Sequence, residues 1–193
     1  MSRQQRRRRT IINPAAQRRA NFEDDNVVNE WGEEWTDDND DTKNDPFILA
    51  VGSKLLENHR ESHLTGHLSS KMRDLALLLR QMQIIDPNVK LSSDCLRTDQ
   101  ATNLLKSIQI VSGFDPETGL VKKPSMPNRL GPSINIAWDI LRNDVLLNQT
   151  LPYEGKQKEI FEYDSAQRLF KSEWKFKISS NAEKSRKAAL TKV

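Results

Sequence analysis

Cysteine, glycine and long apolar runs are scarce in this chain of 193 residues. The single cysteine, Cys95, excludes an internal disulfide framework. The 7 glycines are not clustered, so there is no glycine-rich phosphate-binding loop, and no Gly-x-Ser-x-Gly or His-Glu-x-x-His motif occurs. These absences remove the commonest signs of catalysis. We therefore expect a protein that is not an enzyme, with no metal site and no cofactor.

Apolar residues are also too dispersed for a membrane protein. The hydrophobic fraction is 36%, and no apolar run approaches the roughly 18 residues that a transmembrane helix needs. The arginine-rich start lacks the apolar stretch of a secretory signal. The sequence predicts no membrane partner and an intracellular protein, and its basic cluster favours a nuclear or nucleocytoplasmic location.

Charge is abundant but sorted into two opposed blocks within the first 45 residues. Residues 1–22 hold seven arginines and no acid, whereas residues 23–45 hold eleven acids and one base, Lys43. Large apolar side chains are few in both blocks. Such segments cannot bury enough surface to offset the entropy lost on ordering. We expect a disordered arginine-rich arm over 1–22 and a disordered acidic segment over 23–45.

From Pro46 onward the apolar spacing is typical of helices, and the predicted fold class is mainly α. We expect a small domain of four to five short helices over 46–178. Asp45-Pro46 predicts a helix start, and further helices are expected from Ser69 or Ser70 to Ile85 and from near Thr98 to Gly113.

The second half of this domain has more proline and more polar residues. It predicts a loop over 114–132, a helix capped by Ser133, a linker or extended segment over 151–162, and a last helix from Asp164 or Ser165 through Trp174. Residues 179–193 are expected to form a basic, frayed tail. Because the core is small, we expect that either a homo-oligomer or a partner contributes to full stability.

The arginine arm carries the main functional hypothesis. Guanidinium groups stay charged and bind phosphate through paired hydrogen bonds. In composition, residues 1–22 resemble the arginine-rich arms of viral coat proteins and of phage and retroviral RNA-binding regulators. The resemblance implies a mode of binding, namely contact with the backbone of RNA or DNA, with RNA favoured, in regulation, packaging or assembly. A viral accessory or nucleocapsid-associated protein fits this mode, and a cellular chromatin or RNA-processing factor fits it as well. The predicted phosphate contacts are Arg6, Arg7, Arg8, Arg9, Arg18 and Arg19, with a second, weaker set at Lys184, Arg186 and Lys187.

The acidic segment supports an alternative. Trp31 and Trp35 lie four residues apart among acids, a pattern typical of motifs that dock on a protein partner. In this alternative the chain is a protein–protein adaptor and the arm is only a nuclear localisation signal. Two other interpretations stay open: a plain acidic spacer, or a mimic of nucleic acid that holds the arginine arm.

Three further patterns have simpler explanations. His59, His63 and His67 are spaced for a shared metal on one helix, but Gly66 interrupts it and an ordinary exposed helix end is favoured. Leu75, Leu78, Met82 and Ile84 match a leucine-rich export signal, but core packing is favoured. Cys95 is expected to be a small core or surface residue.

Overall fold

The computed structural model describes residues 45–58 and 65–190, and this part of the chain is mainly helical, as predicted. Its α-helices are α3 (Pro46–Asn58), α4 (Thr65–Ile85), α5 (Ala101–Val111), α6 (Ser125–Leu147), α7 (Tyr153–Trp174) and α8 (Ser180–Leu190). Two 3-10 turns, η3 (Asp94–Leu96) and η4 (Thr98–Gln100), precede α5, and a π-helical turn, η5 (Lys175–Ser179), joins α7 to α8. Within the described ranges the sole β feature is an isolated bridge between Phe114 and Val121.

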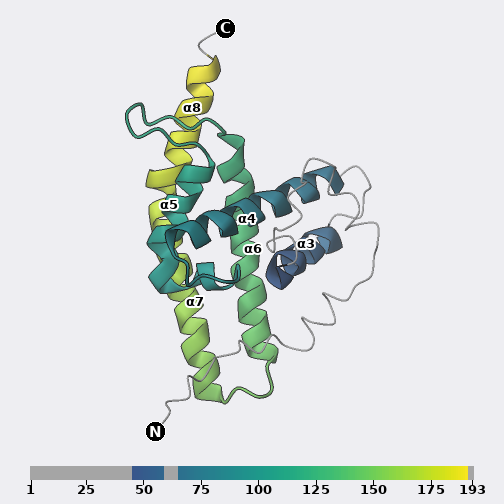
Figure 1. The fold of residues 1–193 in the computed structure, drawn as a ribbon. Coiled ribbons are helices and arrows are strands. Elements are labelled where there is room, and N and C mark those ends of the chain that lie inside the picture. Colours follow the sequence, from purple (N-terminus) through teal and green to yellow (C-terminus); the bar gives the residue numbers. More distant parts are fainter. Residues whose placement is uncertain (1–44, 59–64, 191–193) are drawn as a thin grey trace.

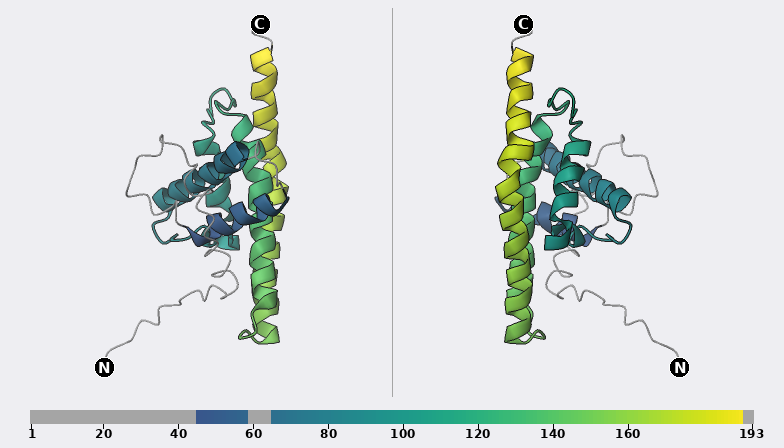
Figure 2. Two further views of the ribbon diagram at one scale, coloured as in Figure 1. Left: turned by 90° about the vertical axis from the view of Figure 1, so that its right-hand side faces the viewer. Right: turned by 90° about the vertical axis from the view of Figure 1, so that its left-hand side faces the viewer.

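The helices form two layers. Helix α6 and the continuous run α7–η5–α8, which we call the rod, lie antiparallel and side by side, and α4 crosses them (Figure 1). Helices α4 and α5 lie on one side of this pair, and α3 crosses α6 with one end level with the rod (Figure 2). The opposite side of the rod is therefore covered by no other helix of the described ranges.

Helix α3 begins at a carboxylate cap. The Oδ1 atom of Asp45 accepts hydrogen bonds from the backbone N–H groups of Phe47 and Ile48, both at 2.9 Å. Its Oδ2 atom accepts a third bond, at 3.0 Å, from the N–H of Ser92. The predicted cap at Asp45-Pro46 is confirmed, and the same side chain ties α3 to the loop after α4.

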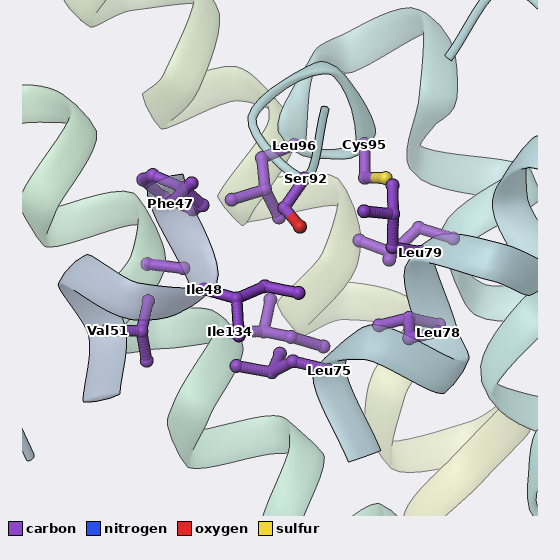
Figure 3. Close-up of a pocket in the computed structure, with 12 residues that line it drawn as sticks. Phe47, Ile48, Val51, Leu75, Leu78, Leu79, Ser92, Cys95, Leu96 and Ile134 are labelled. Carbon is purple, nitrogen blue, oxygen red and sulfur yellow. The ribbon is translucent and has the colours of Figure 1, made fainter. Parts of the chain in front are cut away.

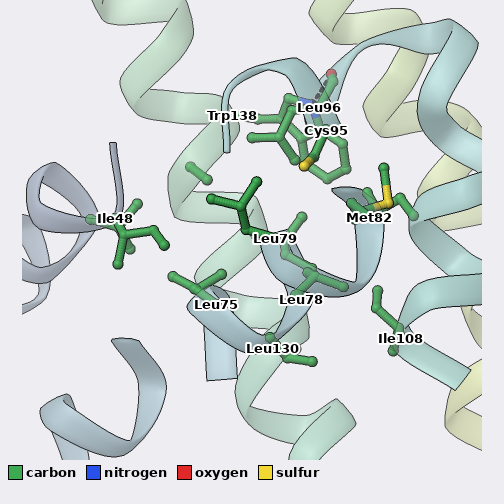
Figure 4. Packing of buried hydrophobic residues seen from close by; sticks show 14 of the residues in the cluster. Ile48, Leu75, Leu78, Leu79, Met82, Cys95, Leu96, Ile108, Leu130 and Trp138 are labelled. Atoms are coloured by element: carbon green, nitrogen blue, oxygen red, sulfur yellow. Dashed lines mark hydrogen bonds between the residues drawn. The ribbon is translucent and has the colours of Figure 1, made fainter. Parts of the chain in front are cut away.

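The core lies where α4 crosses α6 (Figure 4). Trp138 of α6 is 1% exposed, and its indole N–H donates to the carbonyl of Leu96 at 3.0 Å. The same ring meets Phe170 of the rod edge to face, with centroids 5.0 Å apart. Leu75, Leu78 and Met82 are buried in this core, whereas Ile84 is 69% exposed. This confirms core packing for three of the four residues that match the export pattern.

Glycine ends α5 as predicted and also shapes the loop after it. Gly113 and Gly119 adopt positive φ angles of 70° and 67°, which L side chains rarely adopt. Between them Asp115 caps the predicted turn, accepting a 3.0 Å bond from the N–H of Glu117.

The predicted loop over 114–132 is too long, because α6 begins at Ser125. Met126, Leu130 and Ile134 recur every fourth residue and are buried, so packing on α4 favours the helix. Pro132 lies within it, on the exposed side, where water can bind the carbonyl that lost its partner. Ser133 is not a cap: its hydroxyl donates to the carbonyl of Arg129, one turn back.

The expected linker over 151–162 and the frayed tail from 179 are also wrong. The rod starts at Tyr153, directly after Pro152, and remains helical to Leu190. Its polar first half is held by polar contacts: the Thr98 N–H donates to the Glu162 carboxylate at 2.9 Å, and Arg97 pairs with Glu159 at 3.5 Å. Beyond residue 178, Ala182 and Ser185 are buried. Apolar periodicity alone does not reveal a helix stabilised in this way.

Replacing Asp45 with alanine should lower the free energy of unfolding by about 1–3 kcal/mol, because it removes a helix cap and leaves the Ser92 N–H unpaired. Urea denaturation measures this. The exposed Asp99 provides a matched control, since Asp99→Ala should change stability by less than about 0.5 kcal/mol. Equal effects of the two substitutions would contradict the capping role.

Replacing Glu162 with glutamine should destabilise the protein at neutral pH but not in acid. The Thr98 N–H holds the pKa of the Glu162 carboxyl below its usual value, so its charge stabilises the fold above the unfolded pKa of about 4.3. That contribution is lost as pH falls through the lower folded pKa. The difference in urea midpoint between Glu162→Gln and the parent should therefore shrink below about pH 4. A difference that stays constant with pH would show that the charge is not the cause.

Candidate nucleic-acid interface

The rod presents one long exposed surface, which we call the outer face. It runs along the solvent-exposed side of α7 and η5, and its residues recur at helical spacings of three and four. Figure 2 shows the rod along the full height of the molecule, and in Figure 1 it lies on the other side of α6 from α3. The residues of the outer face, all exposed, are Lys158, Phe161, Arg168, Leu169, Lys171, Ser172, Lys175 and Phe176.

The outer face is basic because three of the five acids of α7 have partners on other elements, and a fourth, Glu173, pairs with Lys177 at 2.8 Å. Glu159 pairs with Arg97, Glu162 accepts from Thr98, and Asp164 accepts a 2.7 Å hydrogen bond from the Arg142 guanidinium of α6. Glu154, at the first turn of α7, is exposed.

The central cations of this face are left without carboxylate partners. Within 45–58 and 65–190, no salt bridge involves Arg168, Lys171 or Lys175. The contacts of the acids thus leave an excess of positive charge on the outside.

Two aromatic rings stand among these cations. Phe161 is 73% exposed and Phe176 is 72% exposed, with Leu169 between them at 46%. At 1.5 Å per residue the two rings are separated by about 22 Å along the rod. Cations interleaved with exposed rings are typical of surfaces that bind single-stranded nucleic acid, where bases stack on the rings and phosphates meet the cations.

The π turn fixes the rod against α5. The Lys177 carbonyl accepts hydrogen bonds from Gln109 of α5 at 3.1 Å and from Asn181 at 3.0 Å. A π turn places extra residues in one turn and so rotates the helix that follows. Ile178 is thereby buried while Phe176 stays outside.

The predicted basic set at the C-terminal end lies on α8. Lys184, Arg186 and Lys187 are all exposed. Lys187 pairs with Glu183 at 2.8 Å, and this contact lowers the pKa of the Glu183 carboxyl. The Ser185 hydroxyl accepts a 2.6 Å bond from the N–H of Val121, which holds α8 against the loop.

Sequence reasoning missed the part of the interface on α7 and η5. The expected linker over 151–162 concealed that Lys158 and Phe161 continue the same helix as Lys175. The available signal was the recurrence of Phe161, Leu169 and Phe176 at spacings of eight and seven, which keeps them on one side of a helix.

Most of the predicted contacts cannot be placed. Residues 1–44 lie outside the described ranges, and with them the arginines of the arm, Trp31 and Trp35. His59 and His63 also fall outside. The structure therefore brings together α8 and the outer face but does not relate either to the arm.

The hollow between α3, α4, α5 and α6 is too small to bind a metabolite. It has a volume of about 20 Å³ and an apolar lining broken by Ser92 and Cys95 (Figure 3). Ligand sites are commonly about 300–1,000 Å³, whereas this space fits one water molecule. Burial raises the pKa of the Cys95 thiol far above its ordinary value, so the thiol is an inert core group, as expected.

A smaller apolar surface lies at the turn between α6 and α7. Leu146, Leu147 and Tyr153 are 55%, 60% and 75% exposed there.

None of the helices in the described ranges is both long and apolar enough to span a bilayer.

No protein-family model, curated protein or solved structure matches the chain.

Replacing both Phe161 and Phe176 with serine should leave the free energy of unfolding within about 1 kcal/mol of the parent, because each ring is mostly in solvent. Thermal denaturation measures this. Phe170→Ser is the buried counterpart and should cost at least about 3 kcal/mol. A large loss from the exposed pair would assign those rings to the core instead of a binding surface.

Proposed function

We propose that this protein is a non-enzymatic nucleic-acid-binding protein that binds RNA through the outer face of the rod together with the arginine arm. The observation that carries the proposal is the run of unpaired cations interleaved with two exposed phenylalanines on one continuous rod. Lys184 and Arg186 of α8 extend the same rod and add phosphate contacts.

The two parts of this interface make different kinds of contact with RNA. The arm contributes Arg6, Arg7, Arg8, Arg9, Arg18 and Arg19, whose guanidinium groups bind phosphate with little dependence on sequence. The outer face adds stacking, which contributes roughly 1–3 kcal/mol per base and requires unpaired bases. Together they favour single-stranded RNA over a duplex.

A binding protein of this kind suits a regulatory, packaging or assembly role. The resemblance of the arm to viral arginine-rich arms supports a viral protein, and the same basic cluster supports nuclear or nucleocytoplasmic localisation. The rod is one continuous helical run, so the arm can wrap the strand while the rod fixes its direction.

The adaptor function has one structural observation in its favour. The exposed Leu146, Leu147 and Tyr153 form an apolar tip of the kind that protein partners or a second copy cover. In that function Trp31 and Trp35 dock the partner, and RNA affinity should not depend on the outer face.

Binding of labelled single-stranded RNA, followed by fluorescence anisotropy across a salt series, tests the proposal. The variant Arg168→Ala/Lys171→Ala/Lys175→Ala should weaken binding roughly 10- to 100-fold and reduce the salt slope by about 2, near 0.7 per phosphate contact on single strands. Removing residues 1–22 should weaken it further, because the arm contributes separate contacts.

The matched control removes three lysines that are scattered over α3, α5 and the loop before α6. Lys54→Ala/Lys106→Ala/Lys123→Ala changes the net charge equally but should alter affinity less than threefold. If both triple variants lost the same RNA affinity, the outer face would contribute only non-specific electrostatic attraction and would not be a binding site. No loss from either the face variant or the arm deletion would favour the adaptor.

A further inference from the structure

The outer face lacks a cover among the described residues although it combines features that are costly to leave in water together. Phe161, Leu169 and Phe176 expose apolar surface, and Arg168 and Lys175 beside them have no carboxylate partner within the described ranges. A partner that fits this face needs negative charge and large apolar side chains at helical spacing.

The chain itself contains such a segment. Residues 23–44 hold ten acids and one base. Trp31 and Trp35 lie among those acids, four positions apart, and would share one side of a helix if one formed on docking. The charge of the segment is opposite to that of the outer face, and its two indoles match the apolar surface there.

The acidic segment ends next to Asp45, and this position is close enough to the rod for the contact. Asp45 is bound to Ser92, and Thr98 is bound to Glu162 of the rod. The chain from Ser92 to Thr98 spans at most about 23 Å, at 3.8 Å per residue, so Asp45 lies within roughly 30 Å of Glu162. Trp35 precedes Asp45 by ten residues, which reach about 33 Å when extended. The segment is therefore long enough to span the distance from Asp45 to the turn of the rod that holds Glu162. Trp31, fourteen residues before Asp45, has about 46 Å of chain with which to pass around the rod to Phe161.

We propose that the acidic segment, residues 23–44, docks on the outer face of the rod through Trp31 and Trp35 and occupies it until nucleic acid displaces it. The intramolecular contact depends only on the face and the segment, whereas its regulatory meaning rests on the proposed RNA binding. Because the segment is tethered, its local concentration is of the order of millimolar, so even a weak contact is populated.

RNA competes through its higher charge density. A strand that reaches the outer face meets the arm as well, and the arm joins directly to the acidic segment. Displacement therefore couples binding at the rod to binding at the arm, and it raises selectivity for long or multivalent strands over short anions.

Zero-length carbodiimide cross-linking of the full-length chain, without nucleic acid, tests the docking directly. Cross-linked monomer is digested and analysed by mass spectrometry. We expect links from acids of 23–44 to Lys158, Lys171 or Lys175 at low salt, and their loss at high salt. Lys90 is the matched control, since it is exposed and lies in the loop that leads to Ser92, the partner of Asp45. Lys54 on α3 is a second control, for which only links to 23–44 are counted because it also pairs with Glu57 at 2.7 Å.

The variant Trp31→Ala/Trp35→Ala keeps every acid, and Phe161→Ser/Phe176→Ser keeps every lysine. Each should reduce the links to the outer face at least threefold without changing those to the controls. Links that favour Lys54 and Lys90, links that are unchanged in both variants, or no links at all would overturn the proposal.

A separate RNA titration distinguishes the two proposals. If both hold, Trp31→Ala/Trp35→Ala should tighten RNA binding roughly tenfold at low salt, because the competitor is weakened. If the cross-links form as expected but RNA does not bind, docking stands and the proposed function fails. If RNA binds the outer face but the cross-links do not form there, the proposed function stands and docking fails.

Discussion

Three aromatic rings set the position of the rod against α6, and the remaining helices depend on that position. Trp138 meets Phe170 at 5.0 Å and Phe170 meets Trp174 at 4.9 Å. Trp174 also lies over Gly131, where a Cβ would come within 2.8 Å of the ring. The close approach requires glycine at that position. Since α3 and α4 pack on α6, and α5 is bonded to the rod, these contacts determine which side of the rod remains uncovered.

Ion pairs and hydrogen bonds then make the two sides of the rod differ in charge. An isolated helix with the composition of α7 would carry acids and bases intermingled, and its surface would be close to neutral. Contacts with Arg97, Thr98 and Arg142 hold three of these acids and leave Arg168, Lys171 and Lys175 without carboxylate partners within the described ranges. The Arg142 guanidinium also donates to Gln167 at 2.6 Å, and Gln167 donates to Asn135 at 2.8 Å. A polar network of this kind orients α7 as well as an apolar seam does.

The parts of the fold that follow an apolar pattern could be predicted from the sequence. The cap at Asp45, the most apolar helix ending at Ile85 and the stop at Gly113 all appear as expected, because each depends on local chemistry. The start of α6 could not be predicted, since Pro127 and Pro132 suggest a loop until packing on α4 is known. The first half of α7 was hidden for the opposite reason, because its stabilising partners are polar groups far away in the sequence, on Arg97 and Thr98. The outer face depends on that hidden half, so within the described residues of the candidate interface only Lys184, Arg186 and Lys187 on α8 were predicted from the sequence.

The lone thiol has a consequence for following the protein in solution. Cys95 is 5% exposed and lines the space beneath α3, so it can react only when that part of the core opens. The rate at which a thiol reagent modifies Cys95 therefore measures how often α3 separates from α4. Because the chain has no other cysteine, a cysteine introduced on the surface can be labelled under native conditions while the buried Cys95 remains unlabelled.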